Sequence, residues 1–287
     1  MALADPMAAG IASGWKVTDA ATLDGHTDLE ADVVVIGTGA GGGTTAEILS
    51  AQGLRVIMVE EGRLYHQKDF NMDELKAYGN LYQEGMGRVT KDGAIAVLQG
   101  RCVGGSTTVN WTSSFRTPDE TLNYWSEQFG LEQLAPESMK FWFDNRMERH
   151  NMAPWQIPPN ANNDVLRAGC EKLGWSWGVI PRNVKGCWNL GYCGVGCPTN
   201  AKQGALTTTV PGALANGAHL IHCLRADKLE WRDNRIESLQ ASAFQPDGYT
   251  PSGATVTLRA RHFVVAASAI GTPGLLLRSK LPDPHER

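Results

Sequence analysis

The sequence predicts an α/β fold: a Rossmann-like parallel sheet flanked by helices, with an antiparallel hairpin and a helical, irregular insertion. Two observations predict it. An apolar strand, a glycine-rich turn, a helix-forming run and a second apolar strand follow one another between residues 31 and 60, the order of a right-handed βαβ unit. Farther along, residues 218–244 alternate polar and apolar side chains on both sides of a turn, as a hairpin does.

Residue types support each of these elements. Ala31–Gly37 is apolar apart from Asp32, as a strand buried on both faces of a parallel sheet is. Thr44–Ala51 carries helix-forming residues, and Leu54–Glu60 is the second short apolar strand. In the hairpin, Asp233-Asn234 is a favourable turn pair. Beyond it, Thr255–Ser268 is predicted to form two more strands, the second of them buried.

Composition and charge narrow the classes of function. Hydrophobic residues make up 42% and charged residues 20% of the 287 residues, as in an ordinary globular protein. A net charge of −4 gives no electrostatic reason to expect nucleic acid. The sequence has no run of apolar residues long enough for a membrane span, and its start lacks the basic region of a secretory signal. The expected location is therefore cytoplasmic.

The glycine-rich turn has the pattern of a dinucleotide site. Gly37, Gly39 and Gly42 satisfy G-x-G-x-x-G between a strand and a helix, where glycines let a pyrophosphate approach the backbone amides. Glu60 ends the second strand, where a carboxylate accepts hydrogen bonds from an adenosine ribose. Because this carboxylate would repel a phosphorylated ribose, NADP is disfavoured. The turn alone does not separate NAD from FAD.

A second glycine motif, GRCVGGSTTVN, spans Gly100–Asn110. Its glycine doublet, Gly104-Gly105, allows close approach of a flat or anionic group, and the hydroxyl and amide side chains that follow supply hydrogen-bond partners. Together with SAIGTPGLLLRSK at residues 268–280, this motif resembles the two signatures of the glucose–methanol–choline (GMC) oxidoreductases, which are FAD-dependent enzymes that oxidise alcohols. The sequence departs from the family pattern at Phe115 and Pro118, each one residue late, and at residues 280–282.

The resemblance implies FAD as the cofactor and assigns roles to residues. It places Gly37, Gly39 and Gly42 at the pyrophosphate and Glu60 at the adenosine ribose. The residues that it places on the flavin or pyrophosphate side are Arg101, Gly104, Gly105, Ser106 and Asn110. It also places the backbone of Ala226 beside the adenine and has Ala267 close the pocket. Val109 stands where some relatives carry a flavin-linked histidine, which implies a non-covalent flavin. A nicotinamide dehydrogenase with the same turn is the alternative.

The resemblance also implies a domain organisation. Residues 1–30 are expected to be a loosely ordered extension. Residues 31–118 and 200–287 would form the FAD-binding domain, and residues 119–199 an insertion that contributes to the substrate side. The C-terminal substrate domain of the family is expected to be absent.

Oxidation of CH–OH groups of a small-molecule alcohol is the activity that the resemblance implies. In the family the proton of the substrate hydroxyl goes to a histidine, a residue whose pKa suits this task, in the C-terminal half. None of the seven histidines here, His285 included, has that sequence context. We therefore nominate no catalytic residue and expect a truncated chain that is inactive alone. A non-catalytic FAD-binding module is the alternative, and the particular alcohol, the electron acceptor and the oligomeric state stay open.

Three of the six cysteines form a cluster. Cys187, Cys193 and Cys197 have the spacing C-x5-C-x3-C followed by proline, and the C-x3-C-P end resembles bacterial iron–sulfur runs. Some multi-subunit FAD dehydrogenases of the family carry a three-iron cluster in a comparable place. The alternatives are a structural loop with reduced or disulfide-paired cysteines and a zinc site, for which no fourth ligand lies nearby. An iron–sulfur cluster held by these three cysteines is therefore one of three hypotheses.

Overall fold

A computed structural model describes residues 2–282 of the chain. The chain divides into two compact units, one of residues 1–110 with 186–287 and the other of residues 111–185. The predicted α/β fold is confirmed. The larger unit holds a seven-stranded sheet with helices packed on it, and the smaller unit holds three helices and a two-stranded ribbon.

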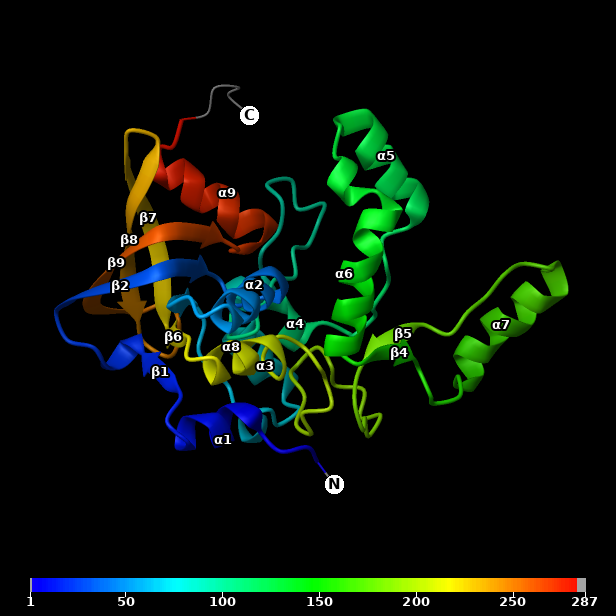
Figure 1. Cartoon of the computed structure of the whole chain (residues 1–287). Helices are drawn as coiled ribbons and strands as arrows, with labels where there is room; N and C mark the ends of the chain where they lie inside the picture. The colour runs from blue at the N-terminus through cyan, green and yellow to red at the C-terminus, as the bar shows by residue number, and fades with distance from the viewer. Residues whose placement is uncertain (1, 283–287) are drawn as a thin grey trace. The chain divides into compact units, whose positions relative to one another are not determined.

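The central sheet has the strand order β1-β6-β3-β2-β9-β8-β7 (Figure 1). Neighbours from β1 to β9 pair in parallel, and β9, β8 and β7 pair antiparallel. The strands are β1 (Lys16–Asp19), β2 (His26–Ile36), β3 (Val56–Val59), β6 (His219–His222), β7 (Leu224–Arg232), β8 (Arg235–Phe244) and β9 (Pro251–Val265). The expected parallel βαβ unit is therefore β2, α2 (Ala40–Ala51) and β3.

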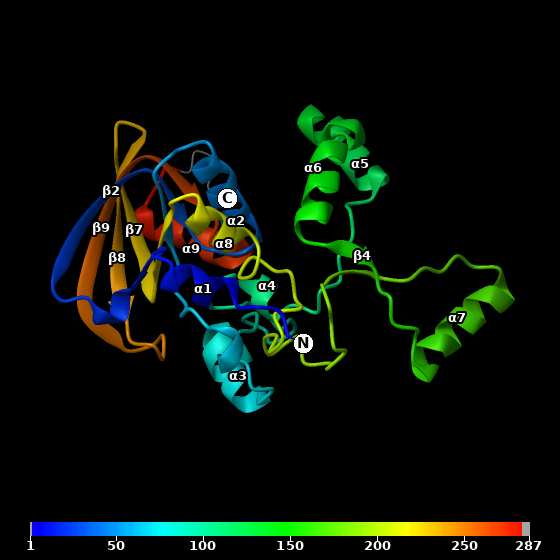
Figure 2. The ribbon, with the colours of Figure 1, turned by 60° about the horizontal axis from the view of Figure 1, so that its bottom comes forward.

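Strand β2 is apolar from Val33 to Ile36 because both of its faces are buried there. Val33 and Val35 belong to one hydrophobic cluster, and Val34 and Ile36 to the other. Helices cover the sheet on each side: α2 packs against α8 (Thr209–Ala215), and α9 (Ser268–Ser279) packs against β7 (Figure 2). The other α-helices among the described residues of this unit are α1 (Pro6–Ala12), α3 (Glu74–Leu81) and α4 (Ser106–Val109).

The hairpin is confirmed for residues 224–244, which form β7 and β8, but residues 219–222 form a separate strand, β6, that pairs in parallel with β1 and β3. Asp233 and Asn234 form the turn of the hairpin with φ angles of 50° and 59°, the left-handed conformation that a two-residue type I′ turn requires. The expectation of two strands in Thr255–Ser268 is wrong. One long strand, β9, occupies the region because β2 pairs with it in a single register from Thr255 to Val265, while β8 pairs with its first part, from Pro251 to Arg259.

The expectation that residues 1–30 are loosely ordered is also wrong. Helix α1 and strand β1 lie in this segment, and β2 already begins at His26. Strand β1 pairs with β6, two hundred residues away in the chain, from Lys16 opposite His219 to Asp19 opposite His222. Met7 of α1 is fully buried in the core. These contacts are all long-range, so the local sequence pattern does not reveal them.

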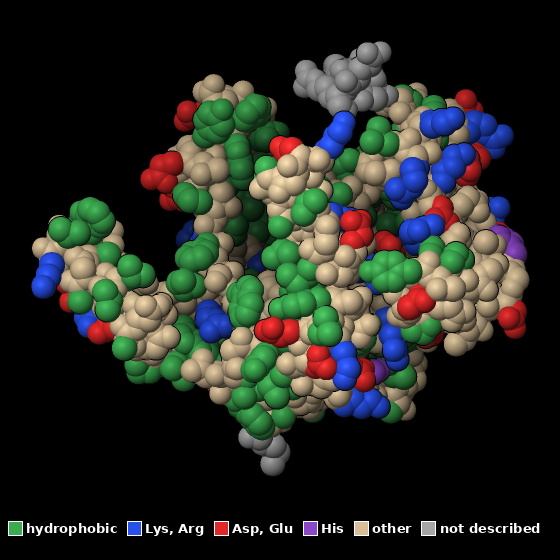
Figure 3. All heavy atoms as spheres, turned by 180° about the vertical axis from the view of Figure 1, so that it is seen from behind, with side chains coloured by type: hydrophobic (Ala, Val, Ile, Leu, Met, Phe, Trp, Pro, Cys, Tyr) green, Lys and Arg blue, Asp and Glu red, His purple; other side chains and the backbone are tan. Residues whose placement is uncertain are grey.

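The smaller unit consists of α5 (Asp119–Phe129), α6 (Pro136–Arg149), α7 (Ala161–Leu173) and a ribbon of β4 (Met152–Pro154) and β5 (Pro181–Asn183). Many of its aromatic and aliphatic side chains are exposed, and apolar side chains recur on its surface in Figure 3. Among the described residues, none of the helices combines the length and the apolar character that crossing a bilayer requires.

Candidate functional site

The glycine turn between β2 and α2 is built so closely that side chains do not fit at two of its positions. Gly37 has a φ of 100°, and a Cβ atom there would lie 2.4 Å from the Ala266 carbonyl oxygen. A Cβ atom at Gly42 would lie 1.9 Å from the Gly37 carbonyl oxygen. These glycines therefore let the strand, the turn and the first turn of α2 pack against each other.

The two glycine motifs, 66 residues apart in the chain, meet in the structure. A Cβ atom at Gly105 would lie 2.9 Å from Cα of Gly39. The Gly104 amide donates a hydrogen bond of 3.0 Å to Oγ1 of Thr38, and that hydroxyl donates one of 2.6 Å to Oε2 of Glu60. Thr38 thus links the first glycine turn, the second glycine motif and the end of β3.

A cavity of about 610 Å³ lies beside this contact, within the size range of small-molecule sites. Its walls come from the first glycine turn, the residues after β3, the start of α4, the start of β7 and the first half of α9. The predicted cofactor residues that line it are Gly37, Gly39, Glu60, Gly105, Ser106, Ala226 and Ala267. The sequence-predicted site therefore comes together largely in one place.

Four predicted cofactor residues do not line the cavity. Gly42 and Gly104 lie behind its wall as close-packing positions. The buried Arg101 side chain points to the β8–β9 turn, where it donates hydrogen bonds of 2.5 Å to the Gly248 carbonyl and 3.1 Å to the Asp247 carbonyl. Asn110, just after α4, presents its carbonyl to a buried lysine instead.

Glu60 is a buried carboxyl group at the edge of the cavity. It accepts hydrogen bonds from the amide and the hydroxyl of Thr38, and from the Gly62 amide at 3.1 Å. Burial raises the pKa of the Glu60 carboxyl to about 7, and this effect outweighs the three hydrogen bonds, which lower it. The predicted acceptor for a ribose therefore already holds the glycine turn in place.

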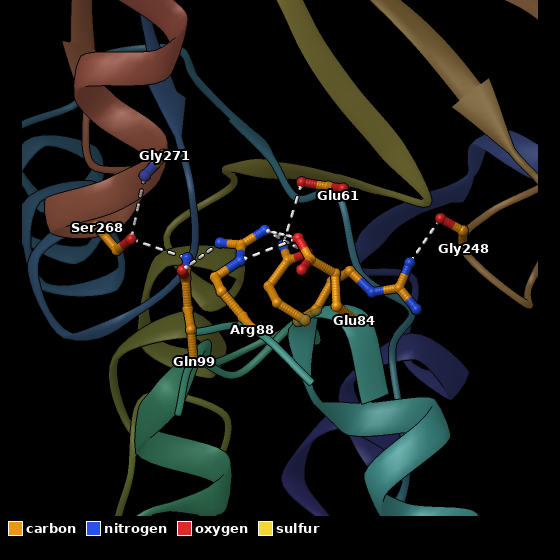
Figure 4. Close-up of polar contacts among 9 residues, drawn as sticks. Glu61, Glu84, Arg88, Gln99, Gly248, Ser268 and Gly271 are labelled. Carbon is orange, nitrogen blue, oxygen red and sulfur yellow. Dashed lines mark hydrogen bonds and ion pairs between the residues drawn. The ribbon is translucent and has the colours of Figure 1, made fainter. Parts of the chain in front are cut away.

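Several polar residues that line the cavity were not predicted. Arg88 donates hydrogen bonds of 2.8 Å to Oε1 of Gln99 and 2.8 Å to Oε1 of Glu84, and Gln99 donates one of 2.8 Å to the Ser268 hydroxyl (Figure 4). Arg88, Gln99 and Ser268 all line the cavity. The only sequence signal for them is the long polar, glycine-interrupted stretch before the second glycine motif, which is typical of functional loops.

Two more arginines line the cavity, Arg225 at the start of β7 and Arg278 on α9. Ala226 lines it, and its carbonyl oxygen accepts a hydrogen bond of 3.1 Å from Arg278 of α9. Arg225 also lines the cavity, with its guanidinium 4.3 Å from the centre of the Phe244 ring. The wall that the resemblance assigns to the adenine is therefore held by α9.

The cysteine cluster receives no support as a metal centre. All six cysteines are free, so the disulfide alternative is not seen in the structure. Cys187, Cys193 and Cys197 are not among the groups of potential ligands that the described residues bring within 4.8 Å of one another. Neither the zinc nor the iron–sulfur hypothesis thus has evidence in the described part of the chain.

The one such group among residues 2–282 is Asp19, His222 and Cys223, at the ends of β1 and β6. Nδ1 of His222 lies 3.4 Å from Sγ of Cys223 and 3.8 Å from Oδ1 of Asp19. The pKa of His222 is lowered to about 4, mainly by burial; the negative charge of Asp19 opposes this shift and the positive charge of Arg63 adds to it. The Arg63 charge also opposes a metal cation, so we read this group as a polar cluster and not as a metal site.

The strand order, the glycine turn and the cavity place the chain in the Rossmann-like α/β class. Residues 78–286 match the GMC oxidoreductase family, and the chain belongs to that family. It is 33% identical over 280 residues to the long-chain-alcohol oxidase FAO1 of Arabidopsis thaliana, covering 95% of this chain and 37% of that protein. It is 34% identical over 270 residues to an uncharacterized GMC-type oxidoreductase of Mycobacterium tuberculosis, covering 93% and 42%.

The fold is also similar to that of a solved structure, pyridoxine 4-oxidase from Mesorbium loti. The TM-score is 0.65 at 17% sequence identity, over 86% of this chain and 51% of that one. The chain therefore spans about half, or less, of the length of these relatives.

Proposed function

We propose that the cavity binds FAD and that the whole protein is an oxidoreductase acting on alcohols, to which this chain contributes the cofactor-binding part. The observation that carries the proposal is the meeting of the two glycine motifs at Gly39 and Gly105 beside a cavity of about 610 Å³. Membership of the GMC oxidoreductase family and the similarity to long-chain-alcohol oxidases support it.

The residues at the glycine turn fit the pyrophosphate of FAD. Helix α2 begins after Gly39, which caps it without a side-chain hydrogen bond, so the first amides of the helix are available to an anion. The place of a Cβ atom at Gly39 is open apart from Cα of Gly105 at 3.9 Å. Backbone at this point can therefore approach a phosphate closely. Arg88, whose charge is paired with Glu84, also lines the cavity.

The residues at the other wall fit an adenosine. Each carboxylate oxygen of Glu60 accepts hydrogen bonds from the protein, but a carboxylate has about four acceptor sites in all. One more donor, such as a ribose hydroxyl, is therefore compatible with the contacts already made. In this proposal Glu60 would hold the ribose, and Leu224 and Ala226 would flank the adenine.

When bound, FAD supplies the acceptor for the hydride that an alcohol carbon releases. The protein must then bind the alcohol and take the proton of its hydroxyl group. No histidine of residues 2–282 lines the cavity. We therefore propose that the proton acceptor belongs to the part of the whole protein that corresponds to the unmatched length of the relatives.

Titration of the purified chain with FAD tests the proposal. We expect one FAD per chain, with a changed visible spectrum and quenched flavin fluorescence, and no comparable binding of NAD. A long-chain primary alcohol added to the loaded chain under anaerobic conditions should leave the flavin oxidised. Tight binding of NAD without binding of FAD would contradict FAD as the cofactor. Bleaching of the flavin by the alcohol would contradict the proposal that the proton acceptor lies outside this chain.

A further inference from the structure

Lys202 is a buried lysine whose ammonium group is surrounded by backbone carbonyls. Its side chain is 5% exposed. Nζ donates hydrogen bonds of 2.8 Å to the Thr108 carbonyl, 2.6 Å to the Asn110 carbonyl and 2.6 Å to the Cys193 carbonyl. An ammonium group has three hydrogens, so these carbonyls match its donors in number. Such a group is costly to bury without partners, which makes this arrangement specific.

The three carbonyls belong to two different segments. Thr108 and Asn110 end the second glycine motif, and Cys193 lies in the cysteine cluster. Tyr82 makes a second link between these two segments. Its hydroxyl donates a hydrogen bond of 2.6 Å to the Gly194 carbonyl and lies 3.4 Å from the Val109 carbonyl. Two buried donors thus hold the cysteine-rich segment (residues 187–197) against the end of the second glycine motif.

The glycine motif needs such support. Helix α4 has only four residues, and a helix of this length has little stability of its own. Its first residues, Ser106 and Thr107, nevertheless line the cavity. Fixing the carbonyls at the end of α4 also fixes the cavity wall at its start, because one helical turn separates them.

The cysteine-rich segment contributes through its backbone and its small residues. Val195 is buried in the main core, and a Cβ atom at Gly196 would lie 2.1 Å from the Phe70 ring. The sulfur of Cys197 lies 3.5 Å from the Thr199 hydroxyl. None of these contacts requires a thiolate or a metal.

We propose that Lys202 is a positioning residue for the flavin end of the cofactor. It clamps the cysteine-rich segment onto the end of α4 and so holds the wall formed by Ser106 and Thr107. This rests on the proposed FAD function. In this proposal the adenosine and pyrophosphate end is built mainly by the glycine turn and the residues after β3, whereas the three hydrogen bonds of Lys202 named above reach the end of α4 and the cysteine-rich segment.

The substitution Lys202→Met tests the role because it keeps the aliphatic stem and removes the donors. We expect the Kd for FAD to rise about tenfold, which is about 1.4 kcal/mol, with an altered visible circular dichroism of the bound flavin. The Kd for ADP, which lacks the flavin, should stay within about twofold of that of the unchanged chain. Lys185→Met, at an exposed lysine, is the control and should change neither value.

The proposal would be overturned if Lys202→Met raised the Kd values for FAD and ADP equally, or if it changed neither value. If Lys202→Met does not fold, Tyr82→Phe keeps the aromatic ring and removes only the second link, and it should show a smaller selective loss of FAD. Failure of the unchanged chain to bind FAD would instead reject the proposed function. A chain with all three clustered cysteines changed to serine should bind FAD normally. If this variant lost both bound iron and FAD, the proposal that the cysteine-rich segment acts through its backbone would be contradicted.

Discussion

Replacing Gly39 by valine is expected to abolish FAD binding and to leave the chain folded. Gly39 has a φ of −67°, which valine adopts without strain, and a Cβ atom there would meet only Cα of Gly105, at 3.9 Å. The added methyl groups would occupy the cavity beside the start of α2. We expect the Kd for FAD to rise about 100-fold, corresponding to about 3 kcal/mol of steric conflict.

Flavin fluorescence titration measures this change, and thermal unfolding of the FAD-free chain reports the fold. Gly79→Val is the matched control, because Gly79 lies on α3 with no atom within 4 Å of the place of its Cβ. Gly105→Val should behave differently and lower the melting temperature, since Gly105 has a φ of 53° and its Cβ would lie 2.9 Å from Cα of Gly39. Normal FAD binding by Gly39→Val would show that the cofactor lies elsewhere.

The contrast between these two glycines shows what the sequence pattern could predict. The pattern G-x-G-x-x-G between two apolar runs is local, and the structure confirms the strand, turn, helix and strand that it predicts. The pattern does not tell which glycine permits close packing and which faces the ligand. That distinction depends on the second motif at Gly105 and on Ala266, which the fold brings in from distant parts of the chain.

The parts that sequence reasoning missed share a dependence on distant residues. Residues 1–30 contain a strand because β6 offers it a parallel edge, and their own composition shows no period-two pattern. Arg101 follows a glycine in the second motif but turns to carbonyls near residue 248. Gln99 becomes a cavity residue through a hydrogen bond to Ser268, 169 residues along the chain. No short window of sequence contains both members of these pairs.

Glu60 is expected to make the stability of the chain fall as the pH rises from about 4.5 to about 7. Burial raises its pKa from 4.5 to about 7 in the folded state, so between these values the folded chain binds a proton that the unfolded chain has released. The free energy of unfolding therefore decreases with pH in this window. The contribution of Glu60 is complete below pH 4.5 and lost above pH 7, a change of about 3 kcal/mol.

The comparison of the unchanged chain with Glu60→Gln isolates this effect, because the other ionisable groups contribute equally to both. Urea unfolding of the FAD-free proteins at several pH values should show the unchanged chain losing about 3 kcal/mol relative to the variant across the window. Glu74→Gln, on the exposed side of α3, is the control and should follow the unchanged chain. A constant difference between Glu60→Gln and the unchanged chain from pH 4.5 to 7 would mean that Glu60 is ionised throughout. The glycine turn would then be held by a carboxylate, and the three hydrogen bonds from Thr38 and Gly62 would outweigh its burial.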